Sequence, residues 1–264
     1  MHESKTVGKA LALLDAVADG PGTVRDLCRA TRLARATVYR LLGTLVDFSY
    51  VRYDPVDRTY RLGFKLLELG HRAEAQSELV RVARPWLERL RDATDETAQL
   101  MIVDGYEGMY IDKAEPQRGF RFWTRVGMRR PLHAGASMRV LLAHLPEDRV
   151  AEILDRKPLP AFTRSTMTDP KKLRVDSQKI RLRGYCVSFE ESHEGAAGVG
   201  APIRDGTGKV VAGISVVGPL SRFTKARLPL LIAETCRAAR GVSRDLGWRG
   251  VPLARPAAGR LPGG

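Results

Sequence analysis

In the first fifth of the chain, apolar residues recur at spacings of three and four, which places them along one face of an α-helix. The first such pattern covers about residues 6–18 and ends at the Gly-Pro-Gly of residues 20–22. Thr23 is a suitable N-cap for a second helix, with Asp26 as a weak capping box, and a third helix begins near Arg35. The pattern predicts a helix followed by a helix-turn-helix.

The third predicted helix has two different faces. Four aliphatic residues face the core: Val38, Leu41, Leu42 and Leu45. The opposite side and its flanks carry small or polar residues: Ala36, Arg40, Gly43 and Asp47, then Thr37, Tyr39 and Thr44. β-Favouring runs at 50–53 and 59–62 surround a turn-forming cluster and predict a hairpin. This order predicts a winged helix-turn-helix whose polar face a DNA major groove could receive.

The rest of the chain changes from helical to mixed patterns. Helical periodicity covers residues 64–91, where Pro85 at a first turn or kink suggests two helices in succession. Short β-favouring runs predict antiparallel strands at 97–103, 108–113, 120–126, 186–190, 199–204 and 210–217. Further helical patterns cover 135–145, 147–155, 171–183 and 224–246. We therefore expect an α+β fold, ending in a disordered basic tail at 249–264.

Charge indicates the partner. The 264 residues include 44 Lys and Arg against 30 Asp and Glu, a formal net charge of +14. This excess favours nucleic acid, with an anionic membrane surface as the second candidate. Four arginines cluster in the helix-turn-helix: Arg29, Arg32, Arg35 and Arg40. They suit phosphate contacts at helix ends and one donor directed at base edges, the alternative being a solvated basic face. Three more lie on the hairpin, where DNA contacts and simple surface charge are both open: Arg52, Arg58 and Arg61.

Signals for catalysis are absent from the sequence. It contains no GxSxG, P-loop lysine or HExxH, and His133 has no recognisable nucleophile partner. Side chains of residues 190–194 would alternate between faces and cannot converge on one ion, so a solvated loop is expected there. The glycine-rich residues 195–200 are expected to mark close backbone approach at a pocket wall rather than a phosphate cradle. We expect no enzyme activity, no metal and no cofactor.

The cysteines and the N-terminus indicate the compartment. Cys28, Cys186 and Cys236 are widely separated without a pairing pattern, which fits a reducing cytoplasm with each thiol as a small buried apolar group. The N-terminus lacks the apolar run of a signal peptide, and no stretch approaches the roughly 20 apolar residues of a membrane span. We expect a cytoplasmic protein that does not bind membranes.

Six motifs follow in a specific order over nearly the whole chain except the tail: KALALLDAVADGPGTVRDLCRATRLARATVYRLLGTL, YRLGFKLLELG, PLHAGASMRVLLAHLP, TDPKKL, RGYCVSFEE and GISVVGP. In this order they resemble the IclR family of bacterial transcriptional regulators. The resemblance implies a winged helix-turn-helix at 1–63, a dimerising linker helix at 64–77, and a GAF-like effector-binding domain at 78–248. The last of these would have an antiparallel sheet flanked by helices.

The resemblance also implies the mode of DNA binding. Such regulators are typically homodimers or dimers of dimers on inverted-repeat operators, with recognition helices about one DNA turn, roughly 34 Å, apart. The residues expected at the DNA are Thr23, Arg32, Arg35, Ala36, Thr37, Tyr39, Arg40, Thr44 and Arg58. The chain departs from the family with Arg32 in place of a glycine and Ala34 in place of a serine N-cap. Arg32 must then adopt a left-handed conformation or the turn must differ, and the third helix loses a side-chain cap.

Matching motifs place the effector-binding residues at Ala136, Ser137, Ser188, Gly198, Ser215 and Val217. An acidic residue is replaced by Ser188, a cysteine by Gly198 and a serine by Val217. A wider and less polar pocket is therefore expected, which favours an aromatic or other bulky organic acid. Free N–H groups at the start of the predicted helix would suit its carboxylate. Three arginines either assist there or are ordinary surface charge: Arg125, Arg129 and Arg130.

These observations predict a sequence-specific transcriptional regulator of double-stranded DNA, with repression favoured over activation. Its operator affinity would be modulated by a small organic effector in the C-terminal domain. The alternative is a DNA-binding regulator without an effector, controlled by protein contacts or abundance.

Overall fold

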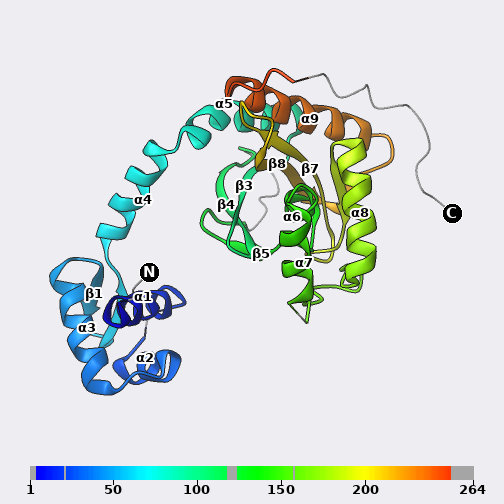
Figure 1. Cartoon of the computed structure of the whole chain (residues 1–264). Helices are drawn as coiled ribbons and strands as arrows, with labels where there is room; N and C mark the ends of the chain where they lie inside the picture. Colours follow the sequence, from blue (N-terminus) through cyan, green and yellow to red (C-terminus); the bar gives the residue numbers. More distant parts are fainter. Residues whose placement is uncertain (1–3, 21, 118–123, 157, 251–264) are drawn as a thin grey trace. The chain divides into compact units, whose positions relative to one another are not determined.

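The computed structural model describes most of the chain, namely residues 4–20, 22–117, 124–156 and 158–250. Contacts divide the chain into two units, Met1–Ser77 and Glu78–Gly264 (Figure 1). The first unit holds helices and a hairpin, and the second holds an antiparallel sheet with helices. The α+β fold class is confirmed.

The first unit matches the predicted elements within a residue or two. They are α1 (Lys5–Ala18), α2 (Val24–Thr31), α3 (Arg35–Asp47), β1 (Val51–Asp54), β2 (Thr59–Leu62) and α4 (Phe64–Gln76). Leu13 of α1, Leu27 of α2 and Leu42 of α3 are almost completely buried in one shared cluster. Burying each such side chain contributes about 1.5–3 kcal/mol, so the amphipathic faces hold the three helices together.

Backbone hydrogen bonds attach the hairpin to the segment before α2 and close the base of the hairpin. The N–H of Tyr60 donates to the carbonyl of Gly22 at 2.9 Å, and the N–H of Gly22 donates back at 3.3 Å. The N–H of Gly63 donates to the carbonyl of Tyr50 at 2.8 Å. A Cβ atom at Gly63 would lie 2.1 Å from the carbonyl oxygen of Ser49, so the chain can return beside the end of α3 only through glycine.

The second unit is built on a six-stranded sheet in the order β5-β4-β3-β8-β7-β6, with all neighbours antiparallel. Its strands are β3 (Thr97–Asp104), β4 (Glu107–Ala114), β5 (Arg129–Pro131), β6 (Cys186–Phe189), β7 (Ala196–Arg204) and β8 (Val210–Pro219). Its helices are α5 (Glu78–Thr94), α6 (Ala136–Leu142), α7 (Glu147–Asp155), α8 (Pro170–Arg183) and α9 (Leu228–Asp245), with a short 3-10 turn at Leu220–Arg222.

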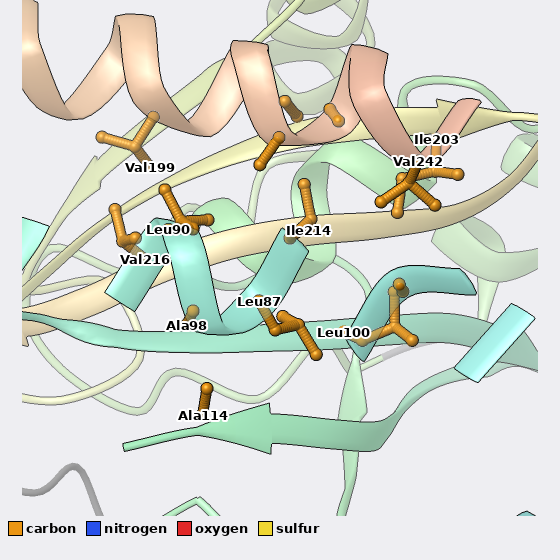
Figure 2. Packing of buried hydrophobic residues seen from close by; sticks show 14 of the residues in the cluster. Leu87, Leu90, Ala98, Leu100, Ala114, Val199, Ile203, Ile214, Val216 and Val242 are labelled. Atoms are coloured by element: carbon orange, nitrogen blue, oxygen red, sulfur yellow. The ribbon is translucent and has the colours of Figure 1, made fainter. Parts of the chain in front are cut away.

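Helices cover both faces of this sheet. On one face, Leu87 of α5, Ile214 of β8 and Val242 of α9 belong to a single buried cluster (Figure 2). The other face meets α6, because Gly200 of β7 lies against the backbone of Ala136. A second cluster combines α6 with residues of α7, α8 and β3. Burial on both faces explains why β7 and β8 are apolar almost throughout.

Two predictions about elements need correction. The break between the two helices falls at Ser77, whereas Pro85 lies inside α5. An internal proline costs about 3 kcal/mol, but α5 buries Leu87 and Leu90 among other side chains, at about 1.5–3 kcal/mol each. Of the strand predicted at 120–126, the three residues that are described lie outside any strand, and β5 forms the edge instead.

Most of the predicted basic tail is outside the described residues, which include only residues 249 and 250 of it.

Among the helices of the described ranges, none combines the length and apolar character that crossing a membrane requires.

The close approach at Gly63 predicts a local loss of stability. Gly63→Ala would force a Cβ against backbone and should destabilise the first unit by about 1–3 kcal/mol. Gly43→Ala is the matched control, since nothing lies within 4 Å of its added Cβ and alanine is favoured in helices. Amide hydrogen exchange of α3 in the full chain should become faster in Gly63→Ala and slower or unchanged in Gly43→Ala. Equal exchange in the two variants would contradict the close contact.

Candidate DNA interface and effector cavity

A residue in the left-handed region closes the turn between α2 and α3. Arg32 has φ 57° and ψ 24°, so the chain keeps a glycine-type turn with an arginine in it. α2 starts with a complete capping box, in which the N–H of Asp26 donates to Thr23 Oγ1 at 3.3 Å and the N–H of Thr23 donates to Asp26 Oδ2 at 3.2 Å. Ala34 gives α3 no side-chain cap. The left-handed alternative and the missing cap are both confirmed.

The predicted contact residues of α3 share one outward face. The exposed ones, with the turn and wing residues, are Arg32, Arg35, Ala36, Tyr39, Arg40, Thr44 and Arg58, while Thr23 and Thr37 are half-buried. Arg35 Nη2 donates to the Tyr39 hydroxyl at 3.3 Å, and its guanidinium carbon lies 5.5 Å from the ring centroid. The two side chains therefore stabilise each other. Contact of this face with DNA stays a prediction.

Positive charge on this face is left unbalanced. Its arginines have no carboxylate partner within the part of the chain that the structure describes: Arg32, Arg35 and Arg40. On the hairpin, by contrast, Arg61 pairs with Asp57 at 3.1 Å and with Asp54 at 3.6 Å. The guanidinium carbon of Arg52 lies 5.2 Å from the Phe64 ring. The guanidinium groups of Arg32, Arg35 and Arg40 are thus available to a phosphate or a guanine, unlike that of Arg61.

In the second unit, one small cavity gathers five of the six predicted effector residues: Ala136, Ser137, Ser188, Gly198 and Val217. The sixth, Ser215 of β8, is fully buried behind it. Gln99 of β3 and Tyr110 of β4 also line the cavity, although neither was predicted from the sequence. A lone polar residue within the apolar run of β3 was the available signal for Gln99. We call this space the effector cavity.

A network of neutral polar groups forms one wall of the effector cavity. Ser137 Oγ lies 2.8 Å from Ser215 Oγ, and both hydroxyls lie within hydrogen-bonding distance of Gln99 Oε1, at 3.4 and 3.3 Å. Gln99 Nε2 donates to Thr124 Oγ1 at 2.7 Å. Burial raises the pKa of Tyr110 to about 12, so its hydroxyl stays neutral at physiological pH. This wall can offer hydrogen bonds to a ligand without any net charge.

The N–H groups at the start of α6 are partly occupied already. The N–H of Ala136 donates to Ser188 Oγ at 2.8 Å, and the N–H of Gly135 donates to Glu191 Oε2 at 3.1 Å. The expectation of free N–H groups at Ala136 and Ser137 is therefore wrong for Ala136. Ser188 thus accepts a hydrogen bond from the backbone at the start of α6.

The effector cavity is narrower and more polar than expected. Its volume is about 20 Å³, space for little more than one water molecule. The helix α6 approaches the glycines of β7 closely, since a Cβ atom at Gly200 would lie 2.8 Å from the carbonyl oxygen of Ala136. No arginine is among its lining residues. Arg129 pairs with Asp104 instead.

The loop predicted to be solvated contains a buried ion pair. Glu191 is 8% exposed and pairs with Arg139 of α6, which is 4% exposed and also pairs with Asp176 of α8. Arg139 thus joins α6, α8 and the loop before β7. The prediction of a solvated loop is wrong for Glu191, because the backbone of Gly135 and the Arg139 guanidinium both need an acceptor there.

Two family models match the chain over most of its length. The model of the IclR helix-turn-helix domain matches residues 6–55, and that of the bacterial transcriptional regulator IclR C-terminal domain matches residues 71–244. The chain belongs to the IclR family. Members of this family are transcriptional regulators, so the protein is a regulator and not an enzyme.

Individual IclR-family proteins are similar over nearly their full length. HTH-type transcriptional regulator KipR of Bacillus subtilis (strain 168) is 34% identical over 248 residues, 94% of this chain and 99% of KipR. A crystal structure of an IclR regulator from Alicyclobacillus acidocaldarius has a TM-score of 0.85 at 27% identity, covering 93% of this chain and all of that one. An IclR homologue from Microbacterium hydrocarbonoxydans, solved with 4-hydroxybenzoate, has a TM-score of 0.79 at 29% identity, covering 92% and 99%.

The other residues considered for chemistry are His133 and the three cysteines. His133 is 1% exposed, and its Nε2 lies 2.9 Å from the carbonyl oxygen of Pro160. Cys186 is buried, while Cys28 and Cys236 are half-buried, so only one thiol is fully inside. Within the described ranges, no three His, Cys, Asp or Glu side chains come together in a way that could hold a metal ion.

Removal of Arg139 should be strongly destabilising. Arg139→Met would leave Glu191 and Asp176 without their cation in a buried place, which costs about 3–5 kcal/mol. Arg174→Met on α8 is the matched control, since its pairs with Glu147 and Asp155 are partly exposed and span 3.3 and 3.9 Å. That change should cost less than about 1 kcal/mol. Urea unfolding of the two variants measures the difference, and similar costs would refute a structural role for the buried pair.

Proposed function

We propose that the chain binds an inverted-repeat operator in the cytoplasm as a homodimer or dimer of dimers and represses transcription. In this proposal, residues 1–63 bind DNA, residues 64–77 link the two halves, residues 78–248 bind an effector, and residues 249–264 form a basic tail. The observation that carries it is the exposed outer face of α3, whose arginines have no acidic partner among the described residues.

The same face supports a division of labour in DNA binding. Arg40 lies in the middle of the outer face of α3, where a side chain inserted in the major groove meets base edges. Arg35 begins the helix, where phosphate contacts are common. Ala36, Thr37 and Thr44 are short enough to allow close approach of α3 to the groove. Arg58 at the turn of the hairpin suits a backbone contact.

The effector cavity supports regulation by a small organic acid. Its neutral hydrogen-bonding wall fits hydroxyl and carboxylate oxygens, and a structural neighbour was solved with 4-hydroxybenzoate. An aromatic acid needs more room than about 20 Å³, so binding requires a wider arrangement of α6, β7 and the loop at Glu191. A ligand that binds only the wide arrangement shifts the equilibrium toward it, which is how it would alter operator affinity.

The second candidate is a regulator without an effector. The small volume of the effector cavity and the occupied N–H groups of Gly135 and Ala136 favour it. Operator binding would then depend on protein contacts or on the abundance of the regulator.

Substitution of the two arginines of α3 tests the DNA-binding proposal. Arg40→Ala should lose about 1–3 kcal/mol on the operator and most of its discrimination against other sequences. Arg35→Ala should weaken binding to operator and random DNA alike and reduce the salt slope by about 1. Arg61→Ala is the control, because acidic neighbours already balance that charge. Fluorescence anisotropy at several salt concentrations measures all three, and unchanged selectivity in Arg40→Ala would disprove its role.

Thermal-shift screening tests the effector proposal. At least one single-ring hydroxy acid, starting with 4-hydroxybenzoate, should raise the melting temperature increasingly with ligand concentration and change operator affinity. Ser137→Ala should weaken that ligand up to about tenfold, because it removes one hydrogen bond from the cavity wall. If no acid stabilises a protein that binds its operator normally, the regulator without an effector is the correct reading.

A further inference from the structure

A second cavity in the C-terminal unit shares no lining residue with the effector cavity. It lies between the end of α8, the strand β7 and the helix α9, and its volume is about 110 Å³. Tyr185, Ile232 and the half-buried Trp248 provide apolar walls. We call it the α9 pocket.

Three arginines from three different elements line the α9 pocket. Arg183 ends α8, Arg204 ends β7 and Arg240 lies on α9. No Asp or Glu is among the lining residues, and within the described ranges none of the three arginines forms an ion pair. Arg237, one turn before Arg240, differs because it pairs with Glu234 at 2.9 Å. The pocket therefore has three positive charges and no internal counterion.

Contacts within the protein orient two of these guanidinium groups. Arg204 Nη1 donates to the carbonyl of Gly208 at 2.8 Å, and its guanidinium carbon lies 5.9 Å from the Trp248 ring. Arg183 Nε donates to the carbonyl of Tyr185 at 2.6 Å, with its guanidinium carbon 5.2 Å from that ring. Each guanidinium has five N–H donors, so most of them remain for a ligand. Orientation before binding lowers the entropy lost when an anion is bound.

The charge of Arg204 also acts on the half-buried side chain of His144. Burial lowers the pKa of His144, and the charges of Arg204 and Arg181 lower it further. Both effects favour the neutral imidazole, and His144 is not among the residues that line the pocket.

We propose that the α9 pocket is a second ligand site, which binds a single-ring aromatic anion. Its ring would lie among Tyr185, Ile232 and Trp248, and its anionic group would face the three arginines. Apolar cavities of about 150 Å³ hold one benzene ring, so a partly open pocket of about 110 Å³ suits one ring and is too small for a nucleotide. Arginines bind carboxylate and phosphate equally well in geometry, so the anionic group is either of the two.

Titration calorimetry and tryptophan fluorescence on the full chain test this proposal. Benzoate and phenyl phosphate are the probes, and the better of the two identifies the anionic group. Benzyl alcohol has the ring without the charge and acetate has the charge without the ring, so both should bind at least about tenfold more weakly. Trp248 emission should change on binding, and Trp248→Phe should remove that change.

Variants distinguish this pocket from the effector cavity and from general charge. Arg183→Gln and Arg240→Gln should each weaken the better probe roughly tenfold or more. Arg237→Gln on the same helix is the matched control and should bind like the parent, as should Ser137→Ala. Three results would overturn the proposal: no binding of either probe at millimolar concentration, equal losses in Arg237→Gln and Arg240→Gln, or loss of binding in Ser137→Ala alone. The last would place the ligand in the effector cavity.

Discussion

Helices cover the central sheet of the second unit on both faces, so polar groups inside it must find partners within the protein. The effector cavity is a result of that constraint. Gln99, Ser137 and Ser215 meet where α6 crosses the sheet, and each hydroxyl and amide there has a hydrogen bond. The glycines of β7 bring α6 close enough to make this network continuous, and the same closeness keeps the cavity small.

The distribution of charge follows a similar logic. Several carboxylates are used inside the second unit: Glu96 is buried beside Arg222 and Arg227, and Glu191 beside Arg139. Carboxylates used this way cannot neutralise surface arginines elsewhere. The positive charge is distributed unevenly, because arginines without an ion pair among the described residues gather on the outer face of α3 and in the α9 pocket. The composition alone predicts an anionic partner. The structure adds where the unpaired arginines lie, namely on the outer face of α3 and in the α9 pocket.

The features predicted best from the sequence are those that depend only on residues close together along the chain. The cap at Thr23, the turn at Arg32 and the buried side of α3 are local, and the structure confirms all three. The effector cavity was harder to predict from the sequence, because Gln99 lies 116 residues from Ser215 and Glu191 lies 52 residues from Arg139 along the chain. Nothing in the spacing of Glu191 shows that it will be buried. The family resemblance located five lining residues, but the size of the cavity depends on how closely α6 packs, which no single position reveals.

The pair of hydrogen bonds between Gly22 and Tyr60 has a mechanical consequence. It makes the segment before α2 a third strand-like neighbour of the hairpin, through a bridge that needs only backbone atoms. A force applied to the hairpin is therefore transmitted to the start of the helix-turn-helix without passing through flexible side chains. We therefore expect the hairpin and the helix-turn-helix to tilt as one stiff piece, so that in the proposed DNA complex a contact of the hairpin with the DNA backbone would also set the angle of α3.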